Sequence, residues 1–158
     1  MYIELVKYPD VFLRSESHPV KFPLDDKTKR LILWMTRAMY QHHGIGLAAI
    51  QVGYQLRMFV MDCSRSRTND KVYINPEIVE KSNETLRDSE GCLSAPGKQG
   101  DVKRHLRIIL KYQDKDGKEE RKTFYNLEAR CIQHEMDHLE GRLCIDYEEG
   151  EYNRDKNK

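Results

Sequence analysis

The sequence predicts an α+β fold in which antiparallel or mixed β-sheets pack around a central helix, with a second helix nearer the N-terminus. Three observations support this prediction. Two segments show the apolar spacing of amphipathic helices, one near residues 26–43 and one near 126–140. Several short runs are rich in β-branched and aromatic residues, and one of them alternates between apolar and polar side chains. The chain of 158 residues shows no repeat or linker, so we expect a single domain over residues 1–158.

The first helix is expected to begin at Asp25 or Asp26, either of which can cap it, and to end at Gly44. Its apolar residues follow the i, i+3, i+4, i+7 spacing of one buried stripe, so we assign them to the core rather than to a cofactor site. They are Leu31, Trp34, Met35, Ala38, Met39 and His42. Residues 1–24 contain three prolines among short apolar pieces and are expected to be extended over the core.

The clearest strand pattern covers residues 106–112, where apolar and polar side chains alternate. Asp116-Gly117 then predicts a hairpin turn into a second strand around residues 121–125. Further strands are expected at residues 56–62, 72–74 and 77–81. The polar residues 82–89 are expected to form a turn, and the tail, residues 148–158, is expected to fray because it has no apolar pattern.

Composition and charge exclude several classes of protein. The chain has 27 basic and 26 acidic residues and a net charge of +1, so we expect no binding to nucleic acid or to a membrane surface. No apolar run approaches the ~20 residues of a membrane-spanning helix, and the first residues lack a signal-peptide pattern. The four cysteines lie far apart, so reduced thiols are expected rather than a disulfide framework. Together these features predict a cytoplasmic protein.

The second helix carries the most informative pattern, His134-Glu135-Met136-Asp137-His138. Residues four apart on a helix project from one face, so His134 and His138 can reach a single metal ion. Glu135 is placed beside them to hold a metal-bound water. We expect Asn126 to cap the start of this helix and Gly141 to adopt a left-handed conformation at its end. The alternative is an ordinary amphipathic helix with two hydrogen-bonded histidines.

A glycine-rich segment follows the first helix: Gly44-Ile45-Gly46-Leu47-Ala48-Ala49-Ile50-Gln51. Its first six residues match the dinucleotide-binding pattern G-x-G-x-x-A. That pattern must follow a strand and open a helix, whereas here it follows a helix, so we reject nucleotide binding. Two interpretations remain about equal. The segment is either a helix stop and turn, or a backbone that approaches a ligand closely with the Gln51 amide available to it.

Two cysteines are candidates for a third metal ligand. Cys144 follows Gly141 by three residues, which copies the spacing of the third histidine in metzincin proteases. Cys92 comes from a distant segment, but it follows Gly91, and a glycine-flanked turn can present backbone amides to a thiolate. A lone cysteine is more often a small buried hydrophobe, and Cys131 is expected to pack in that way. The residues alone favour Cys92 over Cys144 only modestly.

Three motifs taken together resemble the signatures of the peptide deformylase family and occur in the same order. They are Gly44-Ile45-Gly46-Leu47-Ala48-Ala49-Ile50-Gln51, Glu90-Gly91-Cys92-Leu93-Ser94 and Gln133-His134-Glu135-Met136-Asp137-His138. The resemblance extends across nearly the whole chain, including Asn75-Pro76 and Gly141. It implies hydrolysis of the N-formyl group of N-formylmethionyl peptides and nascent proteins, with formate and a free N-terminal methionine as products.

The resemblance also implies a role for individual residues. It implies one divalent metal ion, Fe²⁺ by preference and replaceable by Zn²⁺, Ni²⁺ or Co²⁺. The ligands that it implies are Cys92, His134 and His138. It gives Glu135 the acid–base role, and it gives the Gln51 amide and the Leu93 N–H the polarisation of the substrate carbonyl. The substrate-binding residues that it implies are Gly44, Ile45, Gly46, Leu47, Glu90, Gly91, Leu127 and Cys131.

The sequence departs from the family pattern in two places. Residues 97–100 read Gly-Lys-Gln-Gly, where many members have an arginine-containing segment that contacts bound peptide. The chain also ends soon after Tyr147, where bacterial members usually continue into a C-terminal helix, and in this it resembles short phage-encoded forms. Transient contact with the ribosome is therefore not expected to use that helix. A phage origin would place the protein in the cytoplasm of the host.

Three other functions fit parts of the sequence. A metalloprotease would combine the two histidines with Cys144 and cleave internal peptide bonds. A structural metal domain would have four protein ligands, with Cys131 or Cys144 added to Cys92 and the histidines. A cysteine hydrolase would use Cys92 as its nucleophile and remain active without metal. Three ligands with one open position are typical of a catalytic rather than a structural metal site.

Overall fold

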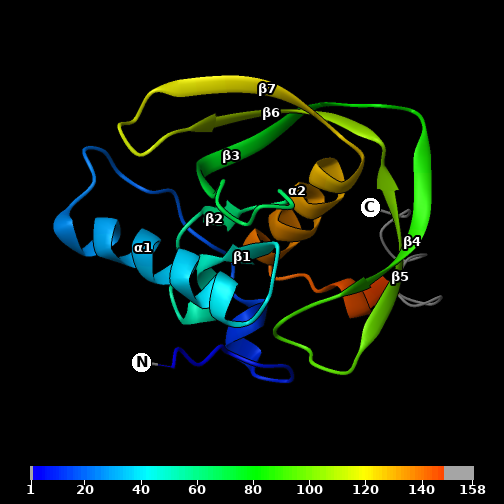
Figure 1. Ribbon diagram of the computed structural model, residues 1–158, viewed down its shortest axis with the longest axis horizontal. Helices are drawn as coiled ribbons and strands as arrows, with labels where there is room; N and C mark the ends of the chain where they lie inside the picture. Colours follow the sequence, from blue (N-terminus) through cyan, green and yellow to red (C-terminus); the bar gives the residue numbers. More distant parts are fainter. Residues whose placement is uncertain (1, 148–158) are drawn as a thin grey trace.

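In the computed structural model, which describes residues 2–147, five strands form one antiparallel sheet and two more form a separate ribbon (Figure 1). The sheet has the strand order β1-β2-β3-β6-β7. Its strands are β1 (Gly46–Ala48), β2 (Met58–Met61), β3 (Lys71–Lys81), β6 (Arg107–Gln113) and β7 (Glu119–Tyr125), and the ribbon pairs β4 (Thr85–Gly91) with β5 (Gln99–His105). The helices are α1 (Asp26–Gln41) and α2 (Asn126–Leu139), with short 3-10 helices at Val11–Arg14, Ala49–Val52 and Cys144–Tyr147. The α+β prediction is confirmed, and the tail predicted to fray, residues 148–158, lies outside the described residues.

The two helices pack on opposite faces of the five-stranded sheet because β2, one of its inner strands, is apolar on both faces. All four residues of β2 are buried, and successive side chains of a strand point to opposite faces. Met58 and Val60 join the core that contains the buried side of α1, whereas Phe59 and Met61 join the core that contains the buried side of α2. The β4–β5 ribbon approaches α2 from another side (Figure 1). The helix that carries the two histidines is therefore central, as expected.

The helix ends follow the sequence signals, with one exception. Asp25 caps α1, because its side chain accepts a hydrogen bond of 2.7 Å from an N–H of the first turn. Gly141 adopts φ +74° just beyond α2, as a left-handed cap requires. The prediction that Asn126 caps α2 is wrong. The helix begins at that residue, and the capping position falls on Tyr125, whose side chain makes no capping bond.

Two further predictions are wrong. The turn predicted at residues 82–89 is mostly strand, because β4 pairs with β5 residue by residue from Thr85↔His105 to Gly91↔Gln99. Both strands are polar, so the sequence shows no apolar alternation that would predict them. The strands form because their backbones pair with each other. Trp34, assigned to the core, is 38% exposed and lies beside the buried stripe of α1 rather than within it.

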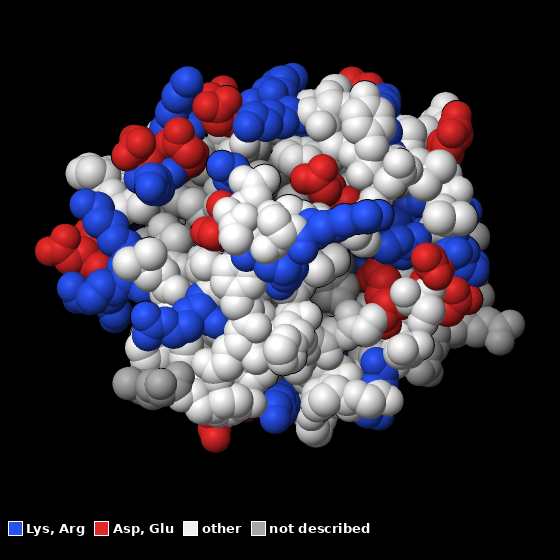
Figure 2. Space-filling model, in the orientation of Figure 1, with Lys and Arg blue, Asp and Glu red and all other residues white. Residues whose placement is uncertain are grey.

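Charged side chains of both signs lie on the surface of the described part of the chain (Figure 2). No helix within residues 2–147 is long and apolar enough to cross a bilayer. Basic and acidic side chains are interspersed over the face drawn in Figure 2, in keeping with the net charge of +1. An even mixture of charges generates little long-range field. All four cysteines are free thiols, as expected.

A buried carboxylate, Asp62, fastens the loop after β2 beside the glycine-rich segment. Asp62 is 2% exposed, and its own N–H donates to the Ile45 carbonyl at 2.8 Å. Its carboxylate accepts hydrogen bonds from the Tyr40 hydroxyl at 2.5 Å, from the N–H and hydroxyl of Ser64 at 2.8 and 2.5 Å, and from the Asn69 N–H at 3.1 Å. Burial alone would raise the pKa of Asp62, but these bonds outweigh it and lower the pKa to about 2 from its usual 3.8.

We expect Asp62→Asn to lower the free energy of unfolding at neutral pH by about 1–3 kcal/mol, because an amide nitrogen then faces donors that the carboxylate satisfies. A carboxyl whose pKa is lower in the folded protein stabilises the fold fully above about pH 4 and loses that contribution as the pH falls toward 2. The difference in stability between wild type and Asp62→Asn should therefore shrink over this range, as measured by urea unfolding at each pH. A constant difference would mean that Asp62 is not ionised in the folded protein.

Candidate active site

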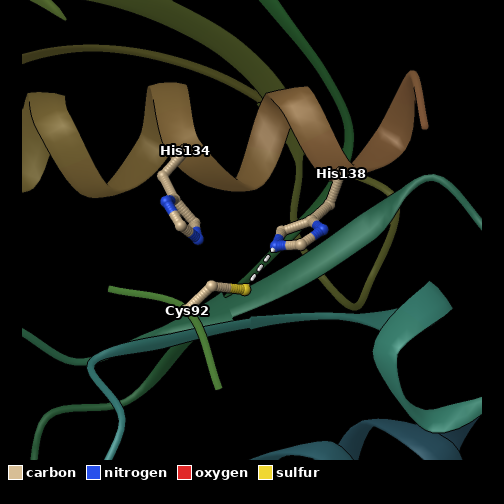
Figure 3. A group of neighbouring side chains, drawn as sticks. All are labelled: Cys92, His134 and His138. Atoms are coloured by element: carbon tan, nitrogen blue, oxygen red, sulfur yellow. Dashed lines mark hydrogen bonds between the residues drawn. The ribbon is translucent and has the colours of Figure 1, made fainter. Parts of the chain in front are cut away.

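Helix α2 carries two histidines one turn apart, and a cysteine approaches them from the end of β4 (Figure 3). His134 and His138 project from the same side of the helix, with ring centroids 5.1 Å apart. Cys92 directly follows β4 and places its Sγ 3.3 Å from His138 Nε2. One ligand atom from each of the three residues lies within 4.8 Å of the other two. Burial lowers the pKa of His138 well below its usual value, whereas for His134 burial is outweighed by the contacts with Cys92 and Glu90, which raise its pKa. A thiolate and two imidazoles that converge in this way fit one divalent ion of borderline softness.

The structure places the two cysteines that are candidates for the third metal ligand in different clusters. Cys144 clusters with Glu90 and His134, and its Sγ lies 3.6 Å from the Glu90 carbonyl oxygen. Burial raises the pKa of the Cys144 thiol to about 11, and within residues 2–147 it is Cys92, not Cys144, that clusters with both histidines. Cys131 belongs to α2 and is buried in the core on the inner side of this helix, as expected. Within residues 2–147, neither of these two cysteines joins Cys92 in a cluster with four ligand atoms.

Glu90 orients His134 through the ring nitrogen on the far side of the cluster. Its Oε1 lies 2.9 Å from His134 Nδ1, so Nε2 is the ring nitrogen directed toward the other two candidate ligands. Arg104 donates two hydrogen bonds of 2.9 Å to the same carboxylate and one of 2.7 Å to Asp137. Burial opposes the charge of Glu90, but hydrogen bonds to Arg104 and His134 hold the pKa of Glu90 well below its usual range. A carboxylate in this position fixes the orientation of a ligating histidine and increases its basicity.

Glu135 lies beside the cluster and is only 3% exposed. Its Oε1 is 4.0 Å from His134 Nε2, and its Oε2 is buried without a hydrogen-bond partner among the described residues. Burial raises the pKa of Glu135 to about 7. A carboxyl with this pKa and an unpartnered oxygen is suited to exchange protons with water or with a substrate at neutral pH.

The glycine-rich segment lies close to the Glu135 carboxyl at Gly46 and close to Leu93 at Gly44, because neither glycine has a side chain. A Cβ at Gly46 would lie 2.7 Å from Cys131 Sγ and 2.9 Å from Glu135 Oε1. A Cβ at Gly44 would lie 2.5 Å from the Leu93 side chain. These distances are shorter than a Cβ tolerates, so only glycine allows the backbone to come this close. Of the two interpretations left open by the sequence, close approach to a ligand site is the one that this geometry supports.

Gln51 is 1% exposed and directs its amide toward the cluster. Its Oε1 accepts a hydrogen bond of 2.9 Å from the Ala48 N–H, which leaves Nε2 as the end that faces the site. Nε2 lies 3.0 Å from the Ser94 hydroxyl and 3.7 Å from Cys92 Sγ. Ser94, which the sequence analysis did not single out, is fully buried and holds the Gln51 amide in place.

A cavity of about 430 Å³ opens beside the cluster and brings together most of the predicted site residues. Those in its wall are Gly44, Ile45, Gly46, Gln51, Glu90, Gly91, Cys92, Leu93, Leu127, Cys131, His134 and Glu135. Leu47 points the other way, because neighbouring residues of a strand face opposite sides, and it is fully buried in the core that contains α1. The wall also contains His43, Ser89 and Arg130, which the sequence analysis missed. For Arg130 a signal existed, since it precedes His134 by one helical turn.

A convergent thiolate and two imidazoles, with a buried carboxyl beside them and a cavity that leads to them, define a metal-dependent hydrolase. The family model described as polypeptide deformylase matches residues 2–153. The chain therefore belongs to the peptide deformylase family.

Individual relatives agree with this assignment. The peptide deformylase of Bartonella henselae is 45% identical over 145 residues, covering 90% of this chain and 82% of the relative. The crystal structure of peptide deformylase from Thermotoga maritima matches with a TM-score of 0.87 and 39% identity, covering 93% of this chain and 97% of that one. A probable peptide deformylase from Synechococcus phage S-SSM7 matches with a TM-score of 0.86 and 38% identity, covering 92% and 99%. The resemblance inferred from the three sequence motifs is confirmed.

Proposed function

We propose that this chain hydrolyses the N-formyl group of N-formylmethionyl peptides and nascent proteins at a single metal ion bound by Cys92, His134 and His138. The observation that carries the proposal is the convergence of these three side chains with Glu135 beside a cavity whose wall includes three glycines. The ligand positions come from two separate segments, and the acid–base group stands next to them. That combination is what hydrolysis of an amide at a metal requires.

We propose Fe²⁺ as the ion, with Zn²⁺, Ni²⁺ or Co²⁺ able to replace it. One thiolate and two imidazoles suit all four ions, and the general order of affinities does not choose among them. The choice of iron therefore rests on the family resemblance. When bound, such an ion acidifies water and polarises a carbonyl oxygen.

Glu135 would carry the proton that this hydrolysis must move. As a carboxylate it accepts a proton from the attacking water, and as an acid it returns the proton to the amine nitrogen that leaves. The C–N bond of the formyl amide breaks, and the products are formate and a free N-terminal methionine. Because burial raises the pKa of Glu135 to about 7, both forms are accessible near neutral pH.

Two donors would stabilise the negative charge that develops on the formyl oxygen. One is the Gln51 amide, whose Nε2 is held beside Cys92 by the Ser94 hydroxyl. The other is the backbone N–H of Leu93, the residue after Cys92, in the wall of the cavity. Prearranged donors of this kind are typically worth ~10²–10³ in rate each.

The methionine side chain would occupy the apolar part of the cavity. Ile45 and Leu127 are 37% and 52% exposed in its wall, and Cys131 lies buried behind them. A flexible thioether chain packs well against an irregular apolar surface of this kind. The backbone of Gly44, Gly46 and Gly91 would pass close to the bound peptide, since no side chain stands in the way there.

We also propose a cytoplasmic location and transient contact with the ribosome, because formylated N-termini occur on nascent chains. The family resemblance supports both.

A comparison of formyl-Met-Ala-Ser with acetyl-Met-Ala-Ser, following release of the free amine, tests the function. We expect the acetyl peptide to react at least ~10²-fold more slowly, because its methyl group displaces the carbonyl and a shift of ~1 Å can cost that factor. Its carbonyl is also less electrophilic. Formate should appear in step with the free amine, and a chelator should stop both.

Other outcomes identify the rival functions. Comparable rates on the two peptides would contradict the specificity. Cleavage after methionine with the formyl group retained would indicate a protease. Full activity after complete metal removal would indicate a cysteine hydrolase that acts through Cys92.

A further inference from the structure

Arg130, one turn before His134 on α2, connects this helix to both strands of the β4–β5 ribbon. Its Nη1 donates to Glu90 Oε2 at 2.6 Å and to the Val102 carbonyl at 3.1 Å. Its Nη2 donates to the Leu86 carbonyl at 2.6 Å. Leu86 and Glu90 belong to β4, and Val102 belongs to β5. A single side chain of α2 thus reaches three acceptors on the ribbon.

Side-chain hydrogen bonds between α2 and the ribbon help to set the position of the ribbon relative to this helix. The ribbon is not hydrogen-bonded into the five-stranded sheet, and two strands alone are only marginally stable in water. Cys92 follows the last residue of β4, so a shift of the ribbon moves the proposed thiolate ligand relative to the two histidines on α2. Besides Arg130, Arg104 of β5 pairs with Asp137 of α2, and the Gln133 side chain of α2 makes two hydrogen bonds to the backbone of His105 at the end of β5.

Both arginines converge on Glu90. Oε2 of Glu90 accepts from Arg104 Nε at 2.9 Å and from Arg130 Nη1 at 2.6 Å. Oε1 accepts from Arg104 Nη2 at 2.9 Å and lies 2.9 Å from His134 Nδ1. A carboxylate offers about four acceptor sites, so all the hydrogen-bond acceptor sites of Glu90 are used. These four bonds together fix the position of its carboxylate. Glu90 is two residues from Cys92 and directly contacts His134, so its placement affects ligands from both segments.

We propose that Arg130 is a positioning residue of the metal site. It holds the strand that leads to Cys92 in a fixed place relative to the helix that carries His134 and His138. The inference rests on the proposed function of this site. Arg104 is 5% exposed and pairs with two carboxylates, so its removal would leave buried charges unpaired and endanger folding. Arg130 lines the cavity with a side chain that is 13% exposed and is therefore the arginine that can be replaced.

Two variants test the role of the guanidinium. Arg130→Met keeps an unbranched apolar stem but removes all three hydrogen bonds, and Arg130→Lys keeps the charge with fewer donors in a different geometry. We expect Arg130→Met to bind Co²⁺ about 10–100-fold more weakly than wild type in competition with a chelator, as is typical when an outer partner of a metal ligand is lost. The Co²⁺ affinity of Arg130→Lys should lie between those of the wild type and Arg130→Met. With Co²⁺ saturating, the kcat for formyl-Met-Ala-Ser should fall more than the KM rises.

Arg107→Met is the matched control. Arg107 belongs to β6 and pairs with Glu80 of β3 at 2.8 Å. This variant therefore also loses an arginine ion pair, but one that joins two strands that do not carry a proposed ligand. It should keep the wild-type Co²⁺ affinity and kcat. Thermal unfolding of all variants separates a loss of stability from a loss of metal affinity.

Wild-type Co²⁺ affinity in folded Arg130→Met would overturn the proposal. So would a rise in KM alone, because it would show that Arg130 only lines the cavity. If Arg130→Met does not fold, Arg130→Lys decides: weaker Co²⁺ binding supports the positioning role, and unchanged binding overturns it. Co²⁺ binding needs no substrate, so these results hold even if the wild-type protein releases no formate, which would contradict the proposed function instead.

Discussion

Replacing Glu135 by alanine should remove most of the turnover and leave the metal bound. The carboxyl stands beside the three clustered ligand atoms and is not one of them. Loss of a general acid–base group typically costs ~10²–10⁴ in rate, and formate release by Glu135→Ala should fall by that factor. Metal content after dialysis, measured by atomic emission, should remain near that of the wild type.

Two further variants sharpen this experiment. Glu135→Gln keeps the volume of the side chain but cannot accept the proton, so its activity should match that of Glu135→Ala. Glu128→Ala removes an exposed carboxylate two turns earlier on the same helix and should behave as wild type. Simultaneous loss of metal and activity in Glu135→Ala would make Glu135 a ligand. Wild-type turnover would remove it from the reaction altogether.

Replacing Cys92 by alanine should abolish both metal binding and formate release. The Cys92 thiolate is one of only three proposed ligands, so the loss of metal affinity should exceed the roughly 10–100-fold typical of outer partners. Metal content after dialysis measures it directly. The Co²⁺ form of the wild type should show thiolate-to-metal absorption, and this absorption should be absent from Cys92→Ala.

Cys144→Ala is the matched control, since it removes a buried thiol that lies near His134 but apart from the cluster with both histidines. It should retain metal and activity, with only the loss of stability that follows from a small cavity. The reverse outcome, with metal lost from Cys144→Ala and kept by Cys92→Ala, would return the site to the arrangement of a metzincin-like protease.

The sequence by itself determined the elements whose signals are local. The alternation in β6 and the cap at Gly141 depend on residues a few positions apart and occur as predicted, and so does the buried stripe of α1 except at Trp34 and His42. The pairing of His134 with His138 also follows from helical spacing alone. The three motifs identified the family for the same reason, because each is a short run of neighbouring residues.

Tertiary structure alone decided which distant residues meet. The β4–β5 ribbon escaped prediction because its strands are polar and are formed by pairing with each other. The ion pairs that Arg104 and Arg130 form with Glu90 could not be predicted from the sequence for a related reason. The three residues lie on three different elements and have no common spacing in the chain. The residues alone favoured Cys92 over Cys144 only modestly, and the packing of the ribbon against α2 places Cys92 beside both histidines. A helix fixes the distance between its own side chains, whereas distances between elements depend on how their surfaces pack, and that information is spread over the whole chain.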